Sequence, residues 1–330
     1  MFEKIIKGIK YRLDEDSLTA VVIRKKDYKG NIVIPENVVS KNLSYRVTRI
    51  GNSAFDRCWD LMSIIIPKSV THIGKYAFTY CKSLTTIRIP DSVTSIGKGA
   101  FSNCESLTSI TIPESVTSIA DYAFCWCTGL LNVVIPDSIT SIGKYTFSNC
   151  NSLITIRIPD SVTSIGEGAF HYCKSLTSIT IPDSVTSIAD HAFGWCRGLL
   201  NVVIPDSVKS IGHGAFFYCE SLTTIRIPDS VTSIGEGAFS NCESLTSITI
   251  PESVTSIAYQ AFGCCNSLTT VRIPDSVKSI GDRAFLMCET LSNIIFNGTI
   301  EQWKNIEIEK NWNQGVPATT VHCSDGDVEL

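Results

Sequence analysis

The sequence predicts a solenoid of stacked β-rungs, because one pattern of 23 residues recurs along most of the 330-residue chain. The segment IPDSVTSIGKGAFSNCESLTSITI, residues 89–112, returns with small edits from about Ile50 to about Phe296. A fixed period of about 20–50 residues is typical of solenoids, in which each repeat buries its apolar face only against its neighbours. Phenylalanine holds one place in every copy, as Phe55, Phe78, Phe101, Phe124, Phe147, Phe170, Phe193, Phe216, Phe239, Phe262 and Phe285.

The first part of each rung reads as a β-strand. In the rung that begins at Leu107, Ile110 and Ile112 are separated by one outward residue, which is the side-chain period of a strand. Pro113 ends this strand, because proline has no amide hydrogen to donate to a continuing ladder. Stacked rungs therefore predict parallel sheets that are buried on one side and open on the other.

The second part of each rung turns back toward the next one. Val116 and Ile119 indicate a corner followed by a second short extended piece. The spacing from Phe124 to Cys127 fits one helical turn that places the ring in the core. We therefore predict a strand-rich α/β solenoid of about eleven 23-residue rungs, each with one short helical turn.

Residues 1–49 depart from the period and are predicted to form an N-terminal β cap with a first irregular repeat. The apolar runs 8–13 and 18–23 flank four polar residues and indicate a β-hairpin. Residues 32–35 resemble the first repeat strand, and extra residues at 40–46 predict a second small hairpin. The leucine-rich repeat array then spans 50–296, as the resemblance described below implies.

Residues 297–330 are predicted to form a C-terminal cap. Thr299 and Gln302 have the spacing of a capping box, which indicates a short helix through Trp303. The strand at residues 306–308 and a last strand at 319–323 extend the sheets, while Trp303 and Trp312 close the core.

The cysteines follow the repeat rather than a disulfide pattern. Eleven of the fourteen lie on the 23-residue step, and free cysteine behaves as a small buried hydrophobe. The sequence predicts a reduced, buried ladder, with Cys125, Cys264 and Cys323 outside it. The members of the ladder are Cys58, Cys81, Cys104, Cys127, Cys150, Cys173, Cys196, Cys219, Cys242, Cys265 and Cys288.

The rungs resemble the BspA-type, or treponemal-class, leucine-rich repeats, whose consensus is close to C-x-x-L-x-x-I-x-I-P-x-x-V-x-x-I-G-x-x-A-F. In the rung that begins at Leu107, Ala120 replaces the consensus glycine. The resemblance covers about Ile50 to Ile295 and implies a non-enzymatic ligand-binding or adhesion protein of a microbial surface, without catalytic residues or cofactors. It is carried by Cys104, Leu107, Ile110, Ile112, Pro113, Val116, Ile119, Ala123 and Phe124.

Arginine and apolar residues at two outward-facing positions of the strand segment predict a protein-binding face. Arginine and apolar side chains are the residues that centres of protein interfaces tend to use. The alternative is that the arginines only keep an exposed sheet soluble. The candidate ligand-binding residues are Arg88, Arg157, Arg226, Arg272, Leu131, Val134, Leu200 and Val203.

A second candidate surface is an aromatic stripe that precedes the cysteine ladder. Its side chains could contact a ligand or could pack over the predicted helical turns. The stripe consists of Tyr80, Trp126, Tyr172, Trp195 and Tyr218.

Composition excludes several functional classes. Lys+Arg 28 against Asp+Glu 32 gives a net charge of −4, which does not favour nucleic acid or an anionic membrane. No apolar run is long enough to span a bilayer. No glycine-rich phosphate loop, H-E-x-x-H motif or paired zinc-ligand spacing occurs, so we expect no enzyme activity, cofactor or metal.

The sequence leaves two alternatives for the cellular location of the protein. The family resemblance implies display at the cell surface or secretion, with a host matrix or other cell-surface protein as the partner. The N-terminal residues carry charges where a signal peptide needs an apolar core, so an intracellular interaction scaffold in the cytoplasm is the alternative. A cysteine ladder also suits reducing conditions.

Overall fold

The computed structural model describes residues 1–330. The chain forms a β-solenoid of about 13 turns with almost no helix. It divides into two compact units, Met1–Val162 (unit 1) and Thr163–Leu330 (unit 2), which are described separately. The prediction of about eleven rungs was slightly low, because β4 (Gly30–Val33) and β27 (Thr320–Cys323), both placed in caps, also pair in parallel with repeat strands.

Unit 1 begins with an antiparallel cap of β1 (Phe2–Ile6), β2 (Ile9–Asp14) and β3 (Thr19–Val22). The β2–β3 hairpin confirms the prediction, whereas β1 was not predicted. Lys7 and Gly8 between β1 and β2 both have positive φ, 47° and 84°, as a tight two-residue hairpin turn requires.

A second hairpin interrupts the first turn of the solenoid, as the extra residues at 40–46 predicted. It consists of β5 (Asn37–Ser40) and the start of β6 (Leu43–Ile50), which pair antiparallel. Lys41 and Asn42 form its turn with φ of 49° and 63°. The far end of β6 then pairs in parallel with β3 and with the repeat strand β8 (His72–Ile73), so the hairpin inserts without breaking the stack.

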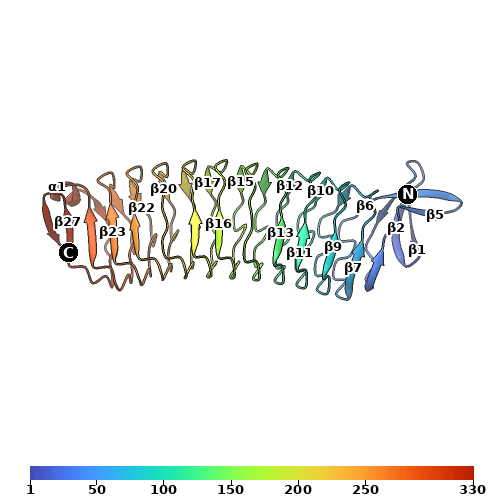
Figure 1. The fold of residues 1–330 in the computed structure, drawn as a ribbon, viewed down its shortest axis with the longest axis horizontal. Helices are drawn as coiled ribbons and strands as arrows, with labels where there is room; N and C mark the ends of the chain where they lie inside the picture. The colour runs from blue at the N-terminus through green and yellow to red at the C-terminus, as the bar shows by residue number, and fades with distance from the viewer. The chain divides into compact units, whose positions relative to one another are not determined.

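The repeats of unit 1 form two series of short parallel strands (Figure 1). The pairings from β7 and β6 onward are in register at the 23-residue step, which confirms the strand, corner and second-strand prediction, whereas β4 pairs with β7 at an offset of 31–32 residues. The first series is β4–β7–β9 and β11–β13, with β7 Leu61–Ile65, β9 Thr86–Arg88, β11 Ser109–Thr111 and β13 Asn132–Val134. The second is β6–β8–β10 and β12–β14, with β10 Ser95–Ile96, β12 Ser118–Ile119 and β14 Ser141–Ile142.

Unit 2 repeats the arrangement. Its first series is β16–β18 and β21–β23–β25–β27, with β16 Ser178–Thr180, β18 Asn201–Val203, β21 Ser247–Thr249, β23 Thr270–Ile273 and β25 Asn293–Phe296. Its second comprises β15 Ser164–Ile165, β17 Ser187–Ile188, β19 Ser210–Ile211, β20 Ser233–Ile234, β22 Ser256–Ile257, β24 Ser279–Ile280 and β26 Glu307–Ile308.

The C-terminal cap of unit 2 contains the predicted helix α1 (Ile300–Lys304), and Thr299 and Gln302 form its capping box. The predicted extensions at β26 and β27 are confirmed. The strand at 319–323 is not the last one, because β28 (Gly326–Glu329) turns back antiparallel beside β27. Trp303 and Trp312 are buried with ring centroids 6.0 Å apart and close the core as predicted.

The predicted helical turn in each rung is wrong. Tyr76 and Tyr80 flank Phe78 with φ of 56° and 59°, and a left-handed residue cannot continue a right-handed helix. The amides of Tyr76, Phe78 and Tyr80 instead donate to carbonyl oxygens of the next coil at 2.7–2.9 Å. The short Phe-to-Cys spacing that suggested a helix reflects one turn bond, from Cys81 N to Phe78 O at 3.2 Å.

The phenylalanines form a buried stack in each unit. From Phe55 to Phe147 in unit 1, successive ring centroids lie 5.0–5.5 Å apart with interplanar angles of 1–5°. From Phe170 to Phe285 in unit 2 they lie 5.3–5.6 Å apart. Parallel rings at this spacing are offset, which is an arrangement that aromatic pairs prefer.

All eleven cysteines of the ladder are buried, and no disulfide joins them. The Cys104 thiol donates to the carbonyl oxygen of Phe78, one coil back, at 3.2 Å, and Cys219 does the same to Phe193 at 3.3 Å. Cysteine therefore fills the core and also gives this backbone carbonyl a second donor, beside the amide of the turn bond. Serine or alanine in this position would lose one of the two contributions.

Burial changes the titration of several thiols of the ladder. It raises the pKa of Cys58 to about 11 and that of Cys242 to about 12, and it raises the pKa of Cys104 and Cys150 well above the ordinary value. The thiolate is the nucleophilic form of cysteine. These four members of the ladder are therefore unreactive structural thiols at neutral pH.

We expect the protein to lose stability steeply in mild alkali. A thiol whose pKa is raised by folding contributes stability that is complete below the unfolded pKa of about 8.5 and is lost at about 1.4 kcal/mol per pH unit above it. Urea midpoints followed by circular dichroism at pH 7.5, 8.5 and 9.5, in reducing agent, measure this. Cys104→Ser, which keeps a donor but does not titrate in this range, should give a shallower decline. Equal midpoints at pH 7.5 and 9.5 would contradict the expectation.

Candidate functional site

The outward face of the first strand series carries exposed apolar side chains in unit 1. Leu131 is 43% exposed, Val134 is 56% exposed and Ile154, one coil further on, is 51% exposed. Val133 between them is buried, since alternate residues of a strand point to opposite faces. We call Leu131, Val134, Ile154 and the neighbouring Arg157 the unit 1 patch.

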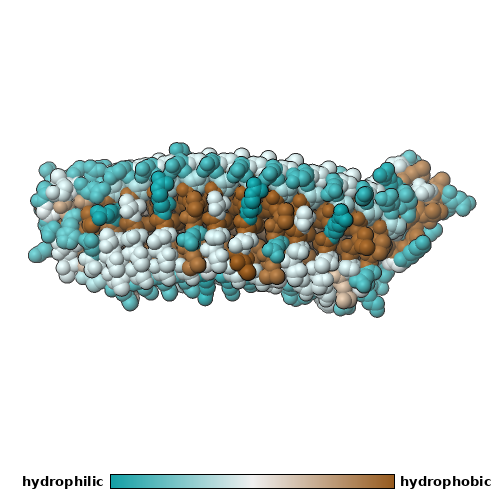
Figure 2. Space-filling view, viewed as in Figure 1, coloured by the Kyte–Doolittle hydropathy of each residue, from teal (hydrophilic) through white to brown (hydrophobic).

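Unit 2 has a similar arrangement. Leu200 is 44% exposed and Val203, in β18, is 57% exposed, and both lie one coil before Arg226. We call these three residues the unit 2 patch. Figure 2 shows apolar side chains interrupted by polar ones on the surface.

The four predicted arginines are exposed but differ in their partners. Arg157 forms an ion pair with Asp137 at 3.1 Å, and Arg226 forms one with Asp206 at 3.0 Å. Each aspartate lies 20 residues before its arginine, in the preceding coil. These pairs hold the two guanidinium groups over the patches.

The other two arginines do not form this pair. Twenty residues before Arg88 the chain has Lys68, and both line one hollow of about 760 Å³. Twenty residues before Arg272 the chain has Glu252, which accepts a hydrogen bond from Asn297 at 3.0 Å. The four positions therefore do not form one uniform cationic row.

Sequence reasoning missed four exposed apolar residues of unit 1 that belong to the same face. Met62, Ile65 and Ile154 lie on the 23-residue step from the outward positions already identified, so the period would have found them. Val33 lies 32 residues before Ile65, because the second hairpin lengthens that coil. Val33, Ile65 and Arg88 are direct neighbours across β4, β7 and β9. The four residues, with their exposed fractions, are Val33 62%, Met62 53%, Ile65 60% and Ile154 51%.

The aromatic stripe differs between the two units. In unit 1, Tyr80 and Trp126 are 37% and 49% exposed and have φ of 59° and 63°. They do not pack over helical turns, because the turns are not helical. The next position along, Asn149, shares the left-handed conformation that asparagine tolerates well.

In unit 2, three members of the stripe stack on one another. Trp195 lies between Tyr172, at 5.0 Å and 8°, and Tyr218, at 4.0 Å and 7°. The guanidinium of Arg197 lies 4.9 Å from the Trp195 ring and also pairs with Glu220. Most of the ring surface is therefore used within the protein, and this part of the stripe is a packing feature.

Comparison with known sequences identifies the repeat. The profile of the BspA type Leucine rich repeat region matches six copies over residues 48–176, 94–222 and 209–311. The chain belongs to the BspA-type leucine-rich repeat family. Such repeat proteins generally act as non-enzymatic interaction scaffolds. No curated protein matches the chain.

Solved structures agree with this assignment. A leucine rich cell surface protein from Faecalibacterium prausnitzii A2-165 is 32% identical over 94% of this chain and 98% of its own, with a TM-score of 0.56. A leucine-rich repeat protein from Bacteroides ovatus ATCC 8483 is 27% identical over 93% of this chain and 99% of its own, with a TM-score of 0.55. The pneumococcal vaccine antigen PcpA, at 18% identity over 96% of this chain and 98% of its own, shares the fold, with a TM-score of 0.56.

Three histidines cluster beside the stack in unit 2 of this BspA-type chain. The His171 and His191 rings lie 5.8 Å apart, and those of His191 and His213 lie 4.8 Å apart. Burial, with the neighbouring His191, lowers the pKa of His171 to about 4. No group of three or more His, Cys, Asp or Glu side chains is arranged to hold a metal ion, and no helix has the length and apolar character to cross a membrane.

We expect Trp195 to contribute to stability and Trp126 to contribute little. Asparagine occurs in the same column at Asn103, Asn149 and Asn241, so Trp195→Asn and Trp126→Asn are matched substitutions that the turn accepts. Trp195→Asn removes two stacked ring contacts, with Tyr172 and Tyr218, worth about 0.5–1.5 kcal/mol each, whereas no ring stacks on Trp126. Denaturant unfolding should show a larger loss for Trp195→Asn by about 1–3 kcal/mol. Equal losses would mean that the stack is not stabilising.

Proposed function

We propose that this protein is a non-enzymatic adhesion protein that binds a protein ligand through the open strand face, at a microbial cell surface. The observation that carries the proposal is the same combination in both units: exposed aliphatic side chains beside an arginine held by an aspartate. The ligand class is a host matrix protein or a protein on another cell.

The energetics favour an interface over a solubilising role for these arginines. Fully burying a Leu or Val side chain yields about 1.5–3 kcal/mol, and these three side chains are about half exposed, so together they supply about 2–5 kcal/mol toward binding. An array kept only for solubility has no reason to place Leu131, Val134 and Ile154 together on its surface. Isolated apolar residues are ordinary, but a contiguous group beside arginine is typical of interaction sites.

The arginines are suited to binding rather than to folding. Both ion pairs are highly exposed, with side-chain exposures of 67–76%, and exposed pairs contribute about 0–1 kcal/mol to stability. A guanidinium already oriented by a carboxylate loses less entropy when a ligand carboxylate or carbonyl approaches. Charge at these sites can therefore be changed with little effect on the fold.

We expect Arg157→Glu and Arg226→Glu each to weaken ligand capture at least about fivefold, because each leaves two carboxylates beside an apolar patch. Binding to a panel of immobilised matrix proteins and to intact cells, by surface plasmon resonance and cell adhesion, measures this. Circular dichroism and thermal midpoints should change little.

The matched controls reverse charge away from the strand face. Arg197→Glu disrupts an ion pair beside the aromatic stack of unit 2, and Lys75→Glu changes an exposed turn residue of unit 1. These variants should bind like the unaltered protein. Full binding by the Arg157 and Arg226 variants, with an intact fold, would remove the strand face from consideration.

A separate experiment tests the cellular location of the protein. The crystallised relative described as a cell surface protein supports display outside the cell. We expect brief protease treatment of intact cells of the native organism to remove the chain while a cytoplasmic marker survives. A chain that is protected until lysis would favour the intracellular interaction scaffold instead.

A further inference from the structure

Trp59 breaks the pattern of its own column on unit 1. At the equivalent place one to four coils later the chain has Lys82, Glu105, Thr128 and Asn151, and no other coil has an aromatic residue there. The Trp59 side chain is nevertheless 58% exposed. Its neighbour Asp60 is also unusual, because the other coils have Ser, Gly or Thr at that place. An exposed indole that replaces a polar residue in a regular array has no packing role to explain it.

Two hollows adjoin at this ring. One, of about 600 Å³, lies between Trp59 and the loop that connects β3 to β4, and includes Arg24, Lys26 and Lys29. The other, of about 630 Å³, lies between Trp59 and Tyr80 and includes Lys82 and Ser83. Both are lined by Arg57 and Asp60 as well. Neither has a single aliphatic side chain in its lining.

The charges at the hollows leave an excess of cations. Arg24 pairs with Asp56 at 3.0 Å, Lys25 with Asp27 at 3.1 Å and Lys82 with Glu105 at 2.8 Å. Lys26, Lys29 and Arg57 have no carboxylate partner, against one unpaired carboxylate, that of Asp60. The Arg57 guanidinium instead lies 5.8 Å from the centroid of the Tyr80 ring. An anionic group would therefore be attracted to this side of unit 1.

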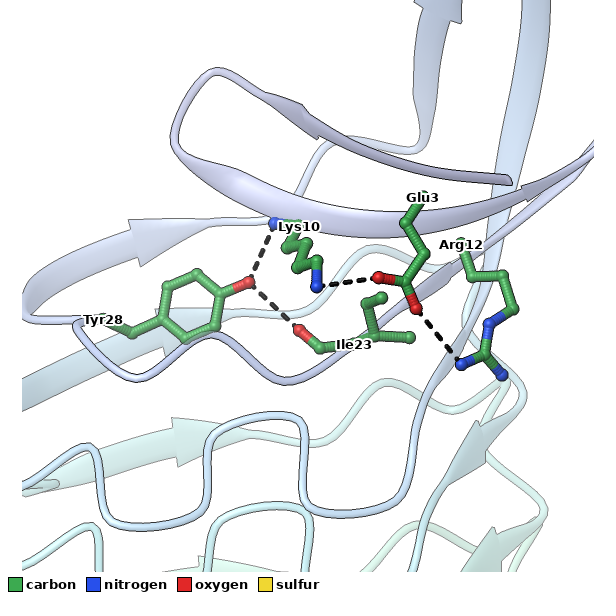
Figure 3. A network of polar contacts seen from close by, with 5 residues as sticks. All are labelled: Glu3, Lys10, Arg12, Ile23 and Tyr28. Carbon is green, nitrogen blue, oxygen red and sulfur yellow. Dashed lines mark hydrogen bonds and ion pairs between the residues drawn. The ribbon is translucent and has the colours of Figure 1, made fainter. Parts of the chain in front are cut away.

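The loop that forms one wall is held in place by Tyr28. The Tyr28 hydroxyl accepts a hydrogen bond from the Lys10 amide at 2.9 Å and donates one to the Ile23 carbonyl at 3.3 Å (Figure 3). The buried Tyr28 ring packs on Phe55 with centroids 4.6 Å apart, at the end of the phenylalanine stack. The wall is thus built before any ligand arrives, which lowers the entropy cost of binding.

We propose that Trp59, Tyr80, Arg57 and Asp60 form a binding site for an acidic saccharide, with a uronic or sialic acid residue at the Trp59 ring. A pyranose ring has an apolar C–H face that can lie on an indole, and a rim of hydroxyl groups. The carboxylate of the sugar pairs with Arg57, since guanidinium and carboxylate match in a bidentate geometry. Asp60 accepts hydrogen bonds from sugar hydroxyls, and Lys26 and Lys29 serve further acidic residues of a longer chain.

The lining favours a saccharide over an acidic peptide. Peptide-binding grooves supply aliphatic pockets or a free strand edge for the bound segment. These hollows supply aromatic rings, charged groups and small polar side chains, but no aliphatic ones. The site is separate from the unit 1 patch and does not depend on the proposed protein-binding function.

Saturation-transfer NMR and titration calorimetry with the full chain test the site. The probes are 3′-sialyllactose, a hyaluronan tetrasaccharide, lactose as the neutral sugar and hexaglutamate as the acidic peptide. Trp59→Thr and Arg57→Asn use residues that the array itself has in those columns, Thr128 and Asn103, so the fold should be retained. Trp126→Asn, which removes another exposed tryptophan of unit 1, is the matched control.

We expect at least one acidic saccharide to bind more tightly than lactose, and Trp59→Thr to weaken that binding at least about tenfold. Arg57→Asn should reduce affinity for the acidic sugar to the level of lactose, and Trp126→Asn should change nothing. Three results would each overturn the site: no binding of either acidic sugar, unchanged binding by a folded Trp59→Thr variant, or hexaglutamate binding as tightly as the sugars.

Discussion

Backbone hydrogen bonds between successive coils impose the constraint on which the rest of this structure depends. They hold neighbouring coils at the spacing of parallel strands, so within the regular repeats each side chain lies over its equivalent 23 residues earlier. The phenylalanine centroids, 5.0–5.6 Å apart throughout both stacks, record that spacing. Equivalent positions of successive coils form a column. A residue is therefore acceptable in a column only if its side chain can pack closely against the residue at the equivalent position of the next coil, whether that residue is the same or different.

Inside the solenoid this constraint selects residues that stack on their own kind. Phenylalanine does so by offset stacking, and cysteine by donating its thiol to a carbonyl one coil back. Outside, it selects against uniform charge, because like charges at this spacing repel. Arginine accordingly recurs only every two or three coils, and Arg157 and Arg226 each have an aspartate from the preceding coil. A residue that departs from its column, such as Trp59, therefore indicates a role other than packing.

Much of the fold was predictable because the local signals agreed with the period. The strand pairs, the hairpin at 40–46, the capping box at Thr299 and the closing pair Trp303 and Trp312 were all anticipated correctly. The helical turn was not, since three residues from Phe to Cys fit either a helix or a turn flanked by left-handed residues. Only hydrogen bonding to the next coil selects the second. The strand β28 and the exposed residues Val33, Met62 and Ile65 were also missed.

The sequence by itself determined the coil length, the residues of the core and the family, because a strict period leaves one consistent way to bury its apolar positions. Only the tertiary structure decided which surface residues have partners. Arg157 and Arg88 occupy equivalent places in their coils, yet one is paired and the other lies beside Lys68. The stripe residues Trp126 and Trp195 are likewise equivalent, yet only Trp195 is stacked. The contacts of a surface residue depend on the surface residues of the coils before and after it. Those surface residues vary from coil to coil, whereas the core residues do not.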